Sequence, residues 1–472
     1  MRRHLRSDLL QALLLLTSLA SAAAAPASPL GVPGCNGPVN ALLSHDGLLY
    51  AGGAYTLAGG QGAGGIAGWN GTTWAPLGSG VAGVRTYWDI YGDTVDIPAQ
   101  VYCLAVYDGE LIAGGSFSSV GGTAAASIAR WDGQQWRPLG AGMPNQIIYT
   151  LIGRITHSFP PAVHCLAVWQ GELYAGGTFS SAGDSTTMAI ARWDGSTWRR
   201  VGQGMAGELP PRVLALAADG DRLLAGGDFR VAGITPSERI GAWNGMVWAP
   251  VAVGGPDRAV HALLVRRGEL LAGGEFTSAD GVAAPFLARW NGSTWSGFPG
   301  GPPNPVRVLR ELDGWIQAGA WAHAAGRWTN RLLTDGAVLT LAPWGDGLAF
   351  GGSFHTVGPR VGWNVEQWPL QPTAAPAGLP AAPQLTRVAP NPLNPGTTLD
   401  FTMPLAGPVT LAVFDARGRR VALLLERTLP AGEHAVTWDG RGAAGEALAS
   451  GVYLAVLRTA EGTSARKLVV AR

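Results

Sequence analysis

The sequence has little charge and almost no cysteine. Only 14% of its 472 residues are Asp, Glu, Lys or Arg, and the formal net charge is +1. A basic surface for nucleic acid or an anionic membrane is therefore missing, and we expect no nucleic-acid partner. The three cysteines, Cys35, Cys103 and Cys165, are too few and odd in number for a disulfide framework. No Cys/His cluster has zinc spacing, so we expect neither a metal site nor a cofactor.

Long apolar runs are missing after the N-terminus. Residues 1–25 combine an arginine-rich start, the apolar run "LLQALLLLTSLA" and the small-residue run "SAAAA". This order is typical of a secretory signal peptide. An uncleaved anchor is the alternative, but the apolar run is short for a membrane span. We predict an exported protein, extracellular or on the outer-membrane surface, with no transmembrane segment once the signal is removed.

Glycine, in contrast, is abundant, and much of it recurs in a repeat. The phrase "ELIAGGSFSSVGG" at 110–122 returns as "ELYAGGTFSSAG" at 172–183 and "ELLAGGEFTSA" at 269–279. Glycine weakens a strand interior, so it marks a bulge or a close approach of backbone. Aligned on the glycine pair, the chain contains six clear units and a degraded one, "IQAGAW", at 316–321. The pairs are Gly52-Gly53, Gly114-Gly115, Gly176-Gly177, Gly226-Gly227, Gly273-Gly274 and Gly351-Gly352.

Tryptophan follows the same repeat. Two tryptophans five residues apart close six of the seven units, and the degraded unit keeps one, Trp328. The pairs are Trp69/Trp74, Trp131/Trp136, Trp193/Trp198, Trp243/Trp248, Trp290/Trp295 and Trp363/Trp368. Since they recur with the repeat, we interpret them as core residues and not as a ligand platform.

Each unit contains four short apolar runs separated by turns. Two of these turns, "YDG" at 107–109 and "WDG" at 131–133, contain Asp-Gly, which favours tight β-hairpins. Repeated four-stranded meanders predict a β-propeller. The predicted fold class is all-β, with a seven-bladed propeller over residues 26–370, and six blades as the alternative. In this fold the glycine pairs let neighbouring sheets approach closely. The units resemble Kelch-type repeats and, more closely, the repeats of fungal cortical marker proteins and many bacterial exported proteins.

A different module follows the Pro/Ala-rich linker at 371–384. Alternating apolar and polar residues between Pro and Gly turns predict a small immunoglobulin-like β-sandwich over residues 385–472. "PNPLNP", "VFDARGRRV", "LPAGEHAVTWDG" and "SGVYLAVL" resemble the FlgD-type immunoglobulin-like domain. That family includes C-terminal sorting domains of type IX secretion. The resemblance implies that the secretion machinery is a partner of this domain.

The sequence carries no pattern of a known catalytic site. It has no nucleophile elbow, HExxH motif or EF-hand loop. We therefore favour a non-catalytic binding or interaction module for an unknown surface glycan or protein. The alternative is a secreted hydrolase or lyase that acts on a glycan, because catalytic carboxylates can come from different blades.

Two insertions interrupt the repeat, at 84–98 and 145–160, and both are interpreted as extra hairpins. They lie at the end of the propeller where the first strand of each unit begins. A variable residue near that start is polar or aromatic in five units. We predict that the variable residues and the two insertions together form a ligand site at this end of the propeller. The alternative is that these side chains cap the channel and hold water. The predicted residues are Asn40, Tyr102, His164, His261 and Arg307, with Trp88, Asp89, Asp93 and Tyr149 from the insertions.

Overall fold

The protein is described here by a computed structural model, and its chain divides into two compact units, Ala24–Pro369 and Leu370–Arg472. No helix long and apolar enough to cross a membrane is found in the described part of the chain. The structure describes residues 28–30, 34–88, 93–144, 147–151, 154–208, 210–312, 314–324, 327–345, 347–357, 360–361, 363–369, 383–393, 396–403, 407–415, 419–429, 432–443, 445–459 and 462–471. The predicted signal peptide lies outside these residues.

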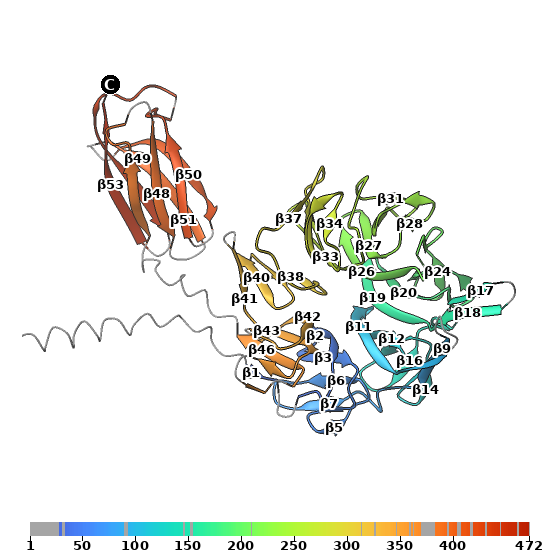
Figure 1. The fold of residues 1–472 in the computed structure, drawn as a ribbon. Helices are drawn as coiled ribbons and strands as arrows, with labels where there is room; N and C mark the ends of the chain where they lie inside the picture. The colour runs from blue at the N-terminus through green and yellow to red at the C-terminus, as the bar shows by residue number, and fades with distance from the viewer. Residues whose placement is uncertain are drawn as a thin grey trace, which may run out of the picture. The chain divides into compact units, whose positions relative to one another are not determined.

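Both units are built from antiparallel β-sheets, so the all-β prediction is confirmed. In the described part of the first unit, six four-stranded sheets follow chain order from the innermost strand outward, and they are arranged in a ring (Figure 1). Their strands are β2 (Val39–His45), β3 (Leu48–Gly53), β6 (Ile66–Trp69) and β7 (Trp74–Pro76); β11 (Gln100–Tyr107), β12 (Glu110–Ser116), β15 (Ile128–Trp131) and β16 (Trp136–Pro138); β19 (Ala162–Trp169), β20 (Glu172–Thr178), β23 (Ile190–Trp193) and β24 (Trp198–Arg200); β26 (Arg212–Asp219), β27 (Arg222–Asp228), β30 (Ile240–Trp243) and β31 (Trp248–Pro250); β32 (Val260–Arg266), β33 (Glu269–Gly274), β36 (Leu287–Trp290) and β37 (Trp295–Gly297); β38 (Leu309–Leu312), β39 (Trp315–Ala318), β40 (Trp321–Ala324) and β41 (Arg327–Asn330).

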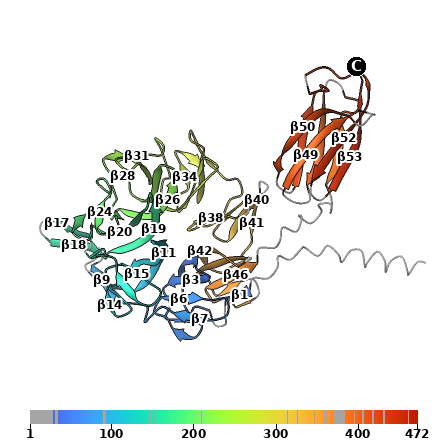
Figure 2. The same ribbon diagram turned by 180° about the vertical axis from the view of Figure 1, so that it is seen from behind.

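One further four-stranded sheet joins the two ends of the repeat region. Its inner strands are β42 (Ala337–Trp344), β43 (Gly347–Ser353) and β46 (Val365–Pro369), and its outermost strand is β1 (Ser28–Pro29). Ser28 lies opposite Gln367, and Pro29 lies opposite Glu366. An N-terminal strand therefore completes the sheet made by the last repeat, as both views of the ribbon show (Figures 1 and 2).

This closure corrects the predicted tryptophan pair of the last unit. Trp368 lies opposite Leu348, where Trp131 lies opposite Leu111 in an ordinary unit. Trp368 therefore takes the place of the first tryptophan, and Trp363 precedes the strand. The prediction that Trp363 and Trp368 form a pair at the end of this unit is wrong, because residues 28–29 supply the fourth strand.

The first glycine of each pair allows neighbouring sheets to pack closely, as predicted for the pair, whereas a Cβ on the second would meet a carbonyl oxygen within its own sheet, such as that of Ala337 for Gly352. A Cβ atom added to Gly351 would lie 2.7 Å from Cγ1 of Val39 in the adjacent sheet. Such an approach is closer than real Cβ contacts, so a side chain here would push the sheets apart. The same contact, at 2.5 to 2.9 Å, recurs for Gly52 with Val101, Gly114 with Val163, Gly176 with Val213, Gly226 with Val260 and Gly273 with Val306.

The five tryptophan pairs of the regular units are part of the packing between sheets. Their ring centroids are 5.3 to 5.5 Å apart. The second tryptophan also donates its indole N–H to a carbonyl oxygen in the segment that follows the preceding sheet. Trp136 bonds in this way to Leu77 at 2.8 Å, and Trp198 bonds to Leu139 at 2.8 Å. These contacts support the interpretation of the pairs as core residues.

The long connections meet at one end of the ring. In the second sheet, the connection between β12 and β15 forms the ribbon β13 (Ser119–Val120) and β14 (Thr123–Ala124), which pairs with β8 (Val81–Ala82) from the preceding connection. Both insertions are hairpins, as predicted. They consist of β9 (Val84–Trp88) with β10 (Thr94–Pro98), and of β17 (Ile147–Leu151) with β18 (Arg154–Phe159). Strand β9 lies next to β18, so the two hairpins are neighbours.

The second unit has two sheets around one core. One sheet is β47 (Gln384–Ala389), β48 (Thr397–Met403) and β51 (Gly432–Trp438). The other is β50 (Arg420–Leu429), β49 (Gly407–Phe414), β52 (Gly451–Thr459) and β53 (Gly462–Val470). Leu399, Leu411 and Leu457 are fully buried between them. This arrangement is the predicted immunoglobulin-like sandwich.

Candidate functional site

A β-bulge near the start of the inner strand explains the variable position of the repeat. In six sheets the pairing of this strand with its neighbour shifts by one residue, so that one residue is left over. The extra residues are Asn40, Tyr102, His164, Leu214, His261 and Leu339. A bulge re-aims a side chain, and the ladder continues on both sides of it with the register shifted by one residue. The flanking residues, such as Val101 and Cys103, stay paired and buried.

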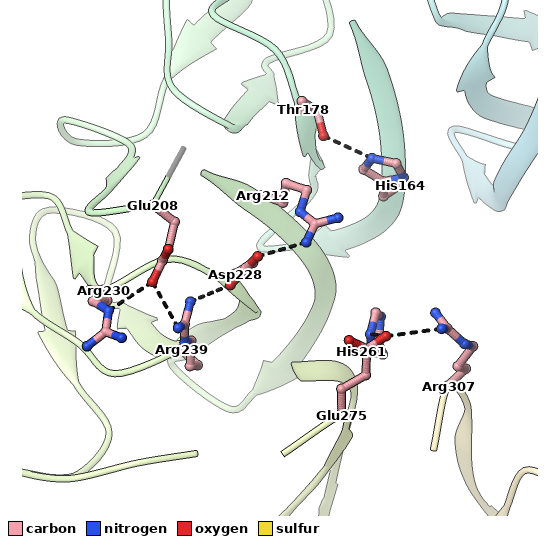
Figure 3. Close-up of polar contacts among 10 residues, drawn as sticks. All are labelled: His164, Thr178, Glu208, Arg212, Asp228, Arg230, Arg239, His261, Glu275 and Arg307. Atoms are coloured by element: carbon pink, nitrogen blue, oxygen red, sulfur yellow. Dashed lines mark hydrogen bonds and ion pairs between the residues drawn. The ribbon is translucent and has the colours of Figure 1, made fainter. Parts of the chain in front are cut away.

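Two of the predicted residues contact each other directly. The rings of Tyr102 and His164 lie 5.0 Å apart between centroids, with their planes tilted by 43°. His164 Nε2 lies 3.0 Å from the hydroxyl oxygen of Thr178, at the end of β20 (Figure 3). Bulges in adjacent sheets thus place an aromatic pair at the start of the inner strands.

The other predicted ring residues form separate contacts. His261 Nε2 lies 3.0 Å from Oε1 of Glu275, and Arg307 Nη2 lies 3.1 Å from the same oxygen (Figure 3). Asn40 donates its side-chain N–H to the carbonyl oxygen of Val101 at 2.9 Å, which joins the first sheet to the second. The structure therefore divides the predicted ring into an aromatic pair, a histidine and an arginine that share Glu275, and a structural amide.

The structure describes few of the side chains that were predicted from the insertions. Asp89 lies outside the described residues, and for Trp88 in β9 and Tyr149 in β17 the structure describes the backbone alone. Asp93 is exposed just before β10. Other residues of the hairpin segments do reach the inner strands, because Ile97 from β10, Phe159 at the end of β18 and the following Pro160 line the same cavity as Tyr102 and His164.

This cavity has a volume of about 380 Å³ and opens where the second, third and fourth sheets meet. It combines apolar walls from the hairpins with polar groups from the inner strands. The lining residues are Ile97, Tyr102, Ser116, Phe159, Pro160, Ala162, His164, Thr178, Glu208, Pro210, Arg212 and Asp228. A concave site with apolar walls and a few convergent polar groups is typical of small-molecule binding.

A network of ion pairs forms one side of the cavity. Arg212 Nη2 donates to Asp228 Oδ2 at 2.7 Å, and Arg239 donates to the other oxygen of Asp228. Arg239 also donates to Glu208 at 2.9 Å, and Arg230 donates to Glu208 at 2.8 Å (Figure 3). Arg239 is 5% exposed, and its backbone has a positive φ of 66°. A buried arginine held by two carboxylates fixes the shape of this wall.

The histidines of the site are held in their neutral form. Burial lowers the pKa of His164 to about 4, and the positive charge of Arg212 contributes to this shift. The pKa of His261 is also lowered, chiefly by burial and by Arg307. Burial raises the pKa of Tyr102, so its phenol stays protonated. At neutral pH the cavity thus offers hydroxyl and imidazole groups beside the arginines and carboxylates.

The cysteines take no part in the site. Cys103 and Cys165 lie on inner strands, and all three cysteines are free thiols. Burial raises the pKa of Cys35 to about 12 and raises the pKa of Cys103 and Cys165 as well. A thiol of this kind is a poor nucleophile and a poor metal ligand. Within the described residues, no group of three or more His, Cys, Asp or Glu is placed to hold a metal ion.

The sequence interpretation missed the second polar position of the repeat. The residue between the glycine pair and the following Phe is the last residue of the second strand, or in the case of Glu275 the residue just after it. It is Ser116, Thr178, Asp228 or Glu275 in four successive units. A polar, variable residue between invariant neighbours within one chain could have identified it. Arg239 had no such signal, because its role depends on the loop that carries Glu208.

Comparisons with known proteins identify one domain. Residues 394–462 match the family model of the FlgD Ig-like domain. The chain has an FlgD Ig-like domain at its C-terminus. The predicted resemblance of this module is therefore confirmed, whereas the predicted Kelch-like character of the repeats stays a prediction. No curated protein is significantly similar to the chain.

Several solved structures are distantly similar. One is PorZ, an essential bacterial surface component of the type-IX secretion system of Porphyromonas gingivalis, at 16% identity and a TM-score of 0.41, covering 93% of this chain and 60% of PorZ. Another is a glycoside hydrolase family 43 arabinoxylan arabinofuranohydrolase from Bacillus subtilis, at 12% identity and a TM-score of 0.22, covering 94% of this chain and 97% of the enzyme. A third is latent PorU from Porphyromonas gingivalis, at 12% identity and a TM-score of 0.16, covering 93% of this chain and 34% of PorU. The chain spans about 60% of the length of PorZ, and similarities at this level say nothing about activity.

Proposed function

We propose that this protein is an exported, non-catalytic binding protein whose propeller holds a glycan or peptide ligand in the cavity beside Tyr102 and His164. The observation that carries this proposal is the convergence of three sheets and both hairpin insertions on one cavity of about 380 Å³. Insertions in a rigid repeat are where binding residues concentrate. Ser116, Thr178, Arg212 and Asp228 lie at the ends of paired strands of the sheets, which hold these polar groups in place before a ligand binds.

Binding is favoured over catalysis by the state of the carboxylates. Among the described residues that line the cavity, Glu208 and Asp228 are the two acidic ones. Both are engaged by arginines, and Arg239 bridges them. A glycosidase needs one carboxyl group as a proton donor and another as a base or nucleophile. Carboxylates tied to one buried arginine are better suited to hold shape and charge than to exchange protons with a substrate.

The C-terminal domain has a separate proposed role. The FlgD Ig-like match supports an autonomous β-sandwich at this end of the chain. We propose that it directs the mature protein to the cell surface through the secretion machinery. Fusing residues 385–472 and a signal peptide to an inert reporter tests this in a host with type IX secretion. Surface display is expected, and periplasmic retention equal to that of the unfused reporter would contradict it.

The binding role is tested with the full mature chain on arrays of glycans and peptides. We expect saturable binding to a limited class of ligands, and no turnover of glycan, ester or peptide substrates. A hydrolytic activity that is lost on substitution of Glu208 or Asp228 would establish the enzyme alternative. Absence of any saturable ligand would favour the interpretation that the ring residues cap the channel and hold water.

A further inference from the structure

Ser116 carries a buried hydroxyl group that has no hydrogen-bond partner among the described residues. It ends β12 and lines the cavity, and it is 1% exposed. Its Oγ makes no hydrogen bond to the part of the chain that the structure describes. The equivalent hydroxyl in the next sheet, on Thr178, is paired with His164 at 3.0 Å. A buried hydroxyl without a partner is costly, so Ser116 marks a place where a ligand oxygen would gain a hydrogen bond.

Arg212 presents a positive charge to the same cavity. It forms one ion pair among the described residues, from Nη2 to Asp228, and its side chain is 41% exposed. Its Nε and Nη1 are therefore left for a ligand. Asp228 is shared with the buried Arg239, so its single negative charge is divided between two guanidinium groups. Figure 3 shows Arg212 between this carboxylate and the His164–Thr178 pair.

The remaining walls fit a small ring with one apolar face. Tyr102 and His164 present aromatic rings, and Ile97 and Phe159 add apolar surface from the hairpins. The volume of about 380 Å³ lies near the lower end of small-molecule sites, which run from about 300 to 1,000 Å³. A pyranose ring has an apolar C–H face for such walls and hydroxyl groups for the polar side.

We infer that the cavity binds an acidic sugar of the uronic acid class. Arg212 anchors the sugar's carboxylate through its positive charge and a charge-assisted hydrogen bond from an N–H that is not bound to Asp228, and Ser116 bonds to one of the sugar's oxygens. This inference rests on the proposed function, because it names the ligand class of the same site. A peptide C-terminus would satisfy Arg212, but it brings an amide and not a ring of hydroxyl groups to the aromatic wall.

Calorimetric titration of the full mature chain tests the inference. The probes are glucuronic and galacturonic acid, the neutral sugars glucose and galactose, and N-acetylglycine as a carboxylate without hydroxyl groups. The variants are Arg212→Gln and Ser116→Ala. Arg222→Gln is the matched control, because Arg222 also pairs with an aspartate, Asp219, on the same two strands but at their other end. Thermal melting of each variant shows whether its fold is kept.

We expect at least one uronic acid to bind, and the neutral sugars to bind at least about tenfold more weakly. Arg212→Gln should weaken uronate binding by about 10- to 100-fold, and Ser116→Ala by about 2- to 10-fold, as expected for hydrogen bonds to charged and neutral groups. Arg222→Gln should leave binding unchanged.

Other results overturn the inference in distinguishable ways. Equal binding of neutral sugars and uronates removes the carboxylate anchor but leaves the binding function in place. Binding of N-acetylglycine as tight as that of the uronates replaces the sugar with a peptide carboxylate. If none of these probes binds, the acidic sugar is wrong, and the array experiment alone decides whether the cavity binds another ligand.

Discussion

Trp74 donates its indole N–H to the carbonyl oxygen of Leu30 at 2.6 Å. The two residues are 44 positions apart, and Leu30 directly follows β1, the N-terminal strand that completes the sheet of the last repeat. The same bond joins Trp136 to Leu77 within the ordinary repeat. The ring is thus closed by the same contact that holds its regular sheets together, with the N-terminal segment acting as the end of the last repeat.

Removal of residues 28–30 should therefore destabilise the propeller. The deletion leaves β46 as an unpaired edge strand, whose open backbone groups also invite aggregation. We expect a lower denaturant midpoint than for Trp74→Phe, which removes one hydrogen bond worth about 1 kcal/mol. Trp136→Phe is the matched control, because it removes the equivalent bond elsewhere in the ring. A truncated chain as stable as the wild type would show that the ring closes without β1.

Gly351→Ala should destabilise the protein by about 1 to 3 kcal/mol, the usual cost of overpacking a core. The new methyl group would lie 2.7 Å from Val39. Gly62→Ala is the control, because no atom lies within 4 Å of a Cβ at Gly62. If the clash is the cause, Val39→Ala should offset part of the loss in the double variant, as measured by chemical denaturation. Additive losses would mean that the two residues are not in contact.

Ser116→Ala should leave the ligand-free protein as stable as the wild type or stabilise it by about 1 kcal/mol. The substitution removes a buried hydroxyl that has no hydrogen-bond partner in the described structure. Thr178→Val is the contrasting variant, because it removes a hydroxyl that is paired with His164, and we expect it to destabilise. A loss of stability in Ser116→Ala equal to that in Thr178→Val would show that Ser116 has a structural partner.

Acidification should weaken the propeller between about pH 6.5 and pH 4. The pKa of His164 falls from 6.5 to about 4 in the folded protein, so the unfolded chain binds a proton that the folded chain refuses in this window. Stability is then fully present above pH 6.5 and declines as the pH falls toward 4. Arg212, His261, Tyr102 and Thr178 surround His164 and set its environment. Melting temperatures of wild type and His164→Phe across this range check the effect, and parallel pH profiles would contradict it.

The repeat made most of the propeller predictable. The contacts that Gly114 and Val101 make with neighbouring sheets recur in every regular unit. Glycine and valine therefore stand at the same positions of each unit, where the sequence shows them. The end of the ring was hidden because β1 is separated from its sheet by the whole domain. The similarity of "SPLG" at 28–31 to "APLG" at 75–78 could have identified the N-terminal segment as the end of a repeat unit.

The bulge residues of the site could be predicted from the sequence, whereas the ion-pair network around Arg239 could not. The bulge residues Tyr102 and His164 stood out because they vary between constant apolar neighbours. The network around Arg239 did not, since it joins a residue with positive φ to Glu208, which lies in an irregular connection. Contacts of this kind depend on the path of a loop, and no periodicity in the sequence records that path.

The cavity beside Tyr102 and His164 is the proposed site of ligand recognition. The most direct measurement compares binding and melting temperature in Tyr102→Ala, His164→Ala and Trp88→Ala, using the ligand class that the arrays identify. We predict that binding is lost in Tyr102→Ala and His164→Ala while both variants stay folded, and that the melting temperature of His164→Ala falls no further than that of Thr178→Val, which breaks the same hydrogen bond. Lower melting temperatures with binding intact would contradict the claim, and would show that these side chains pack the mouth of the channel and do not recognise a ligand.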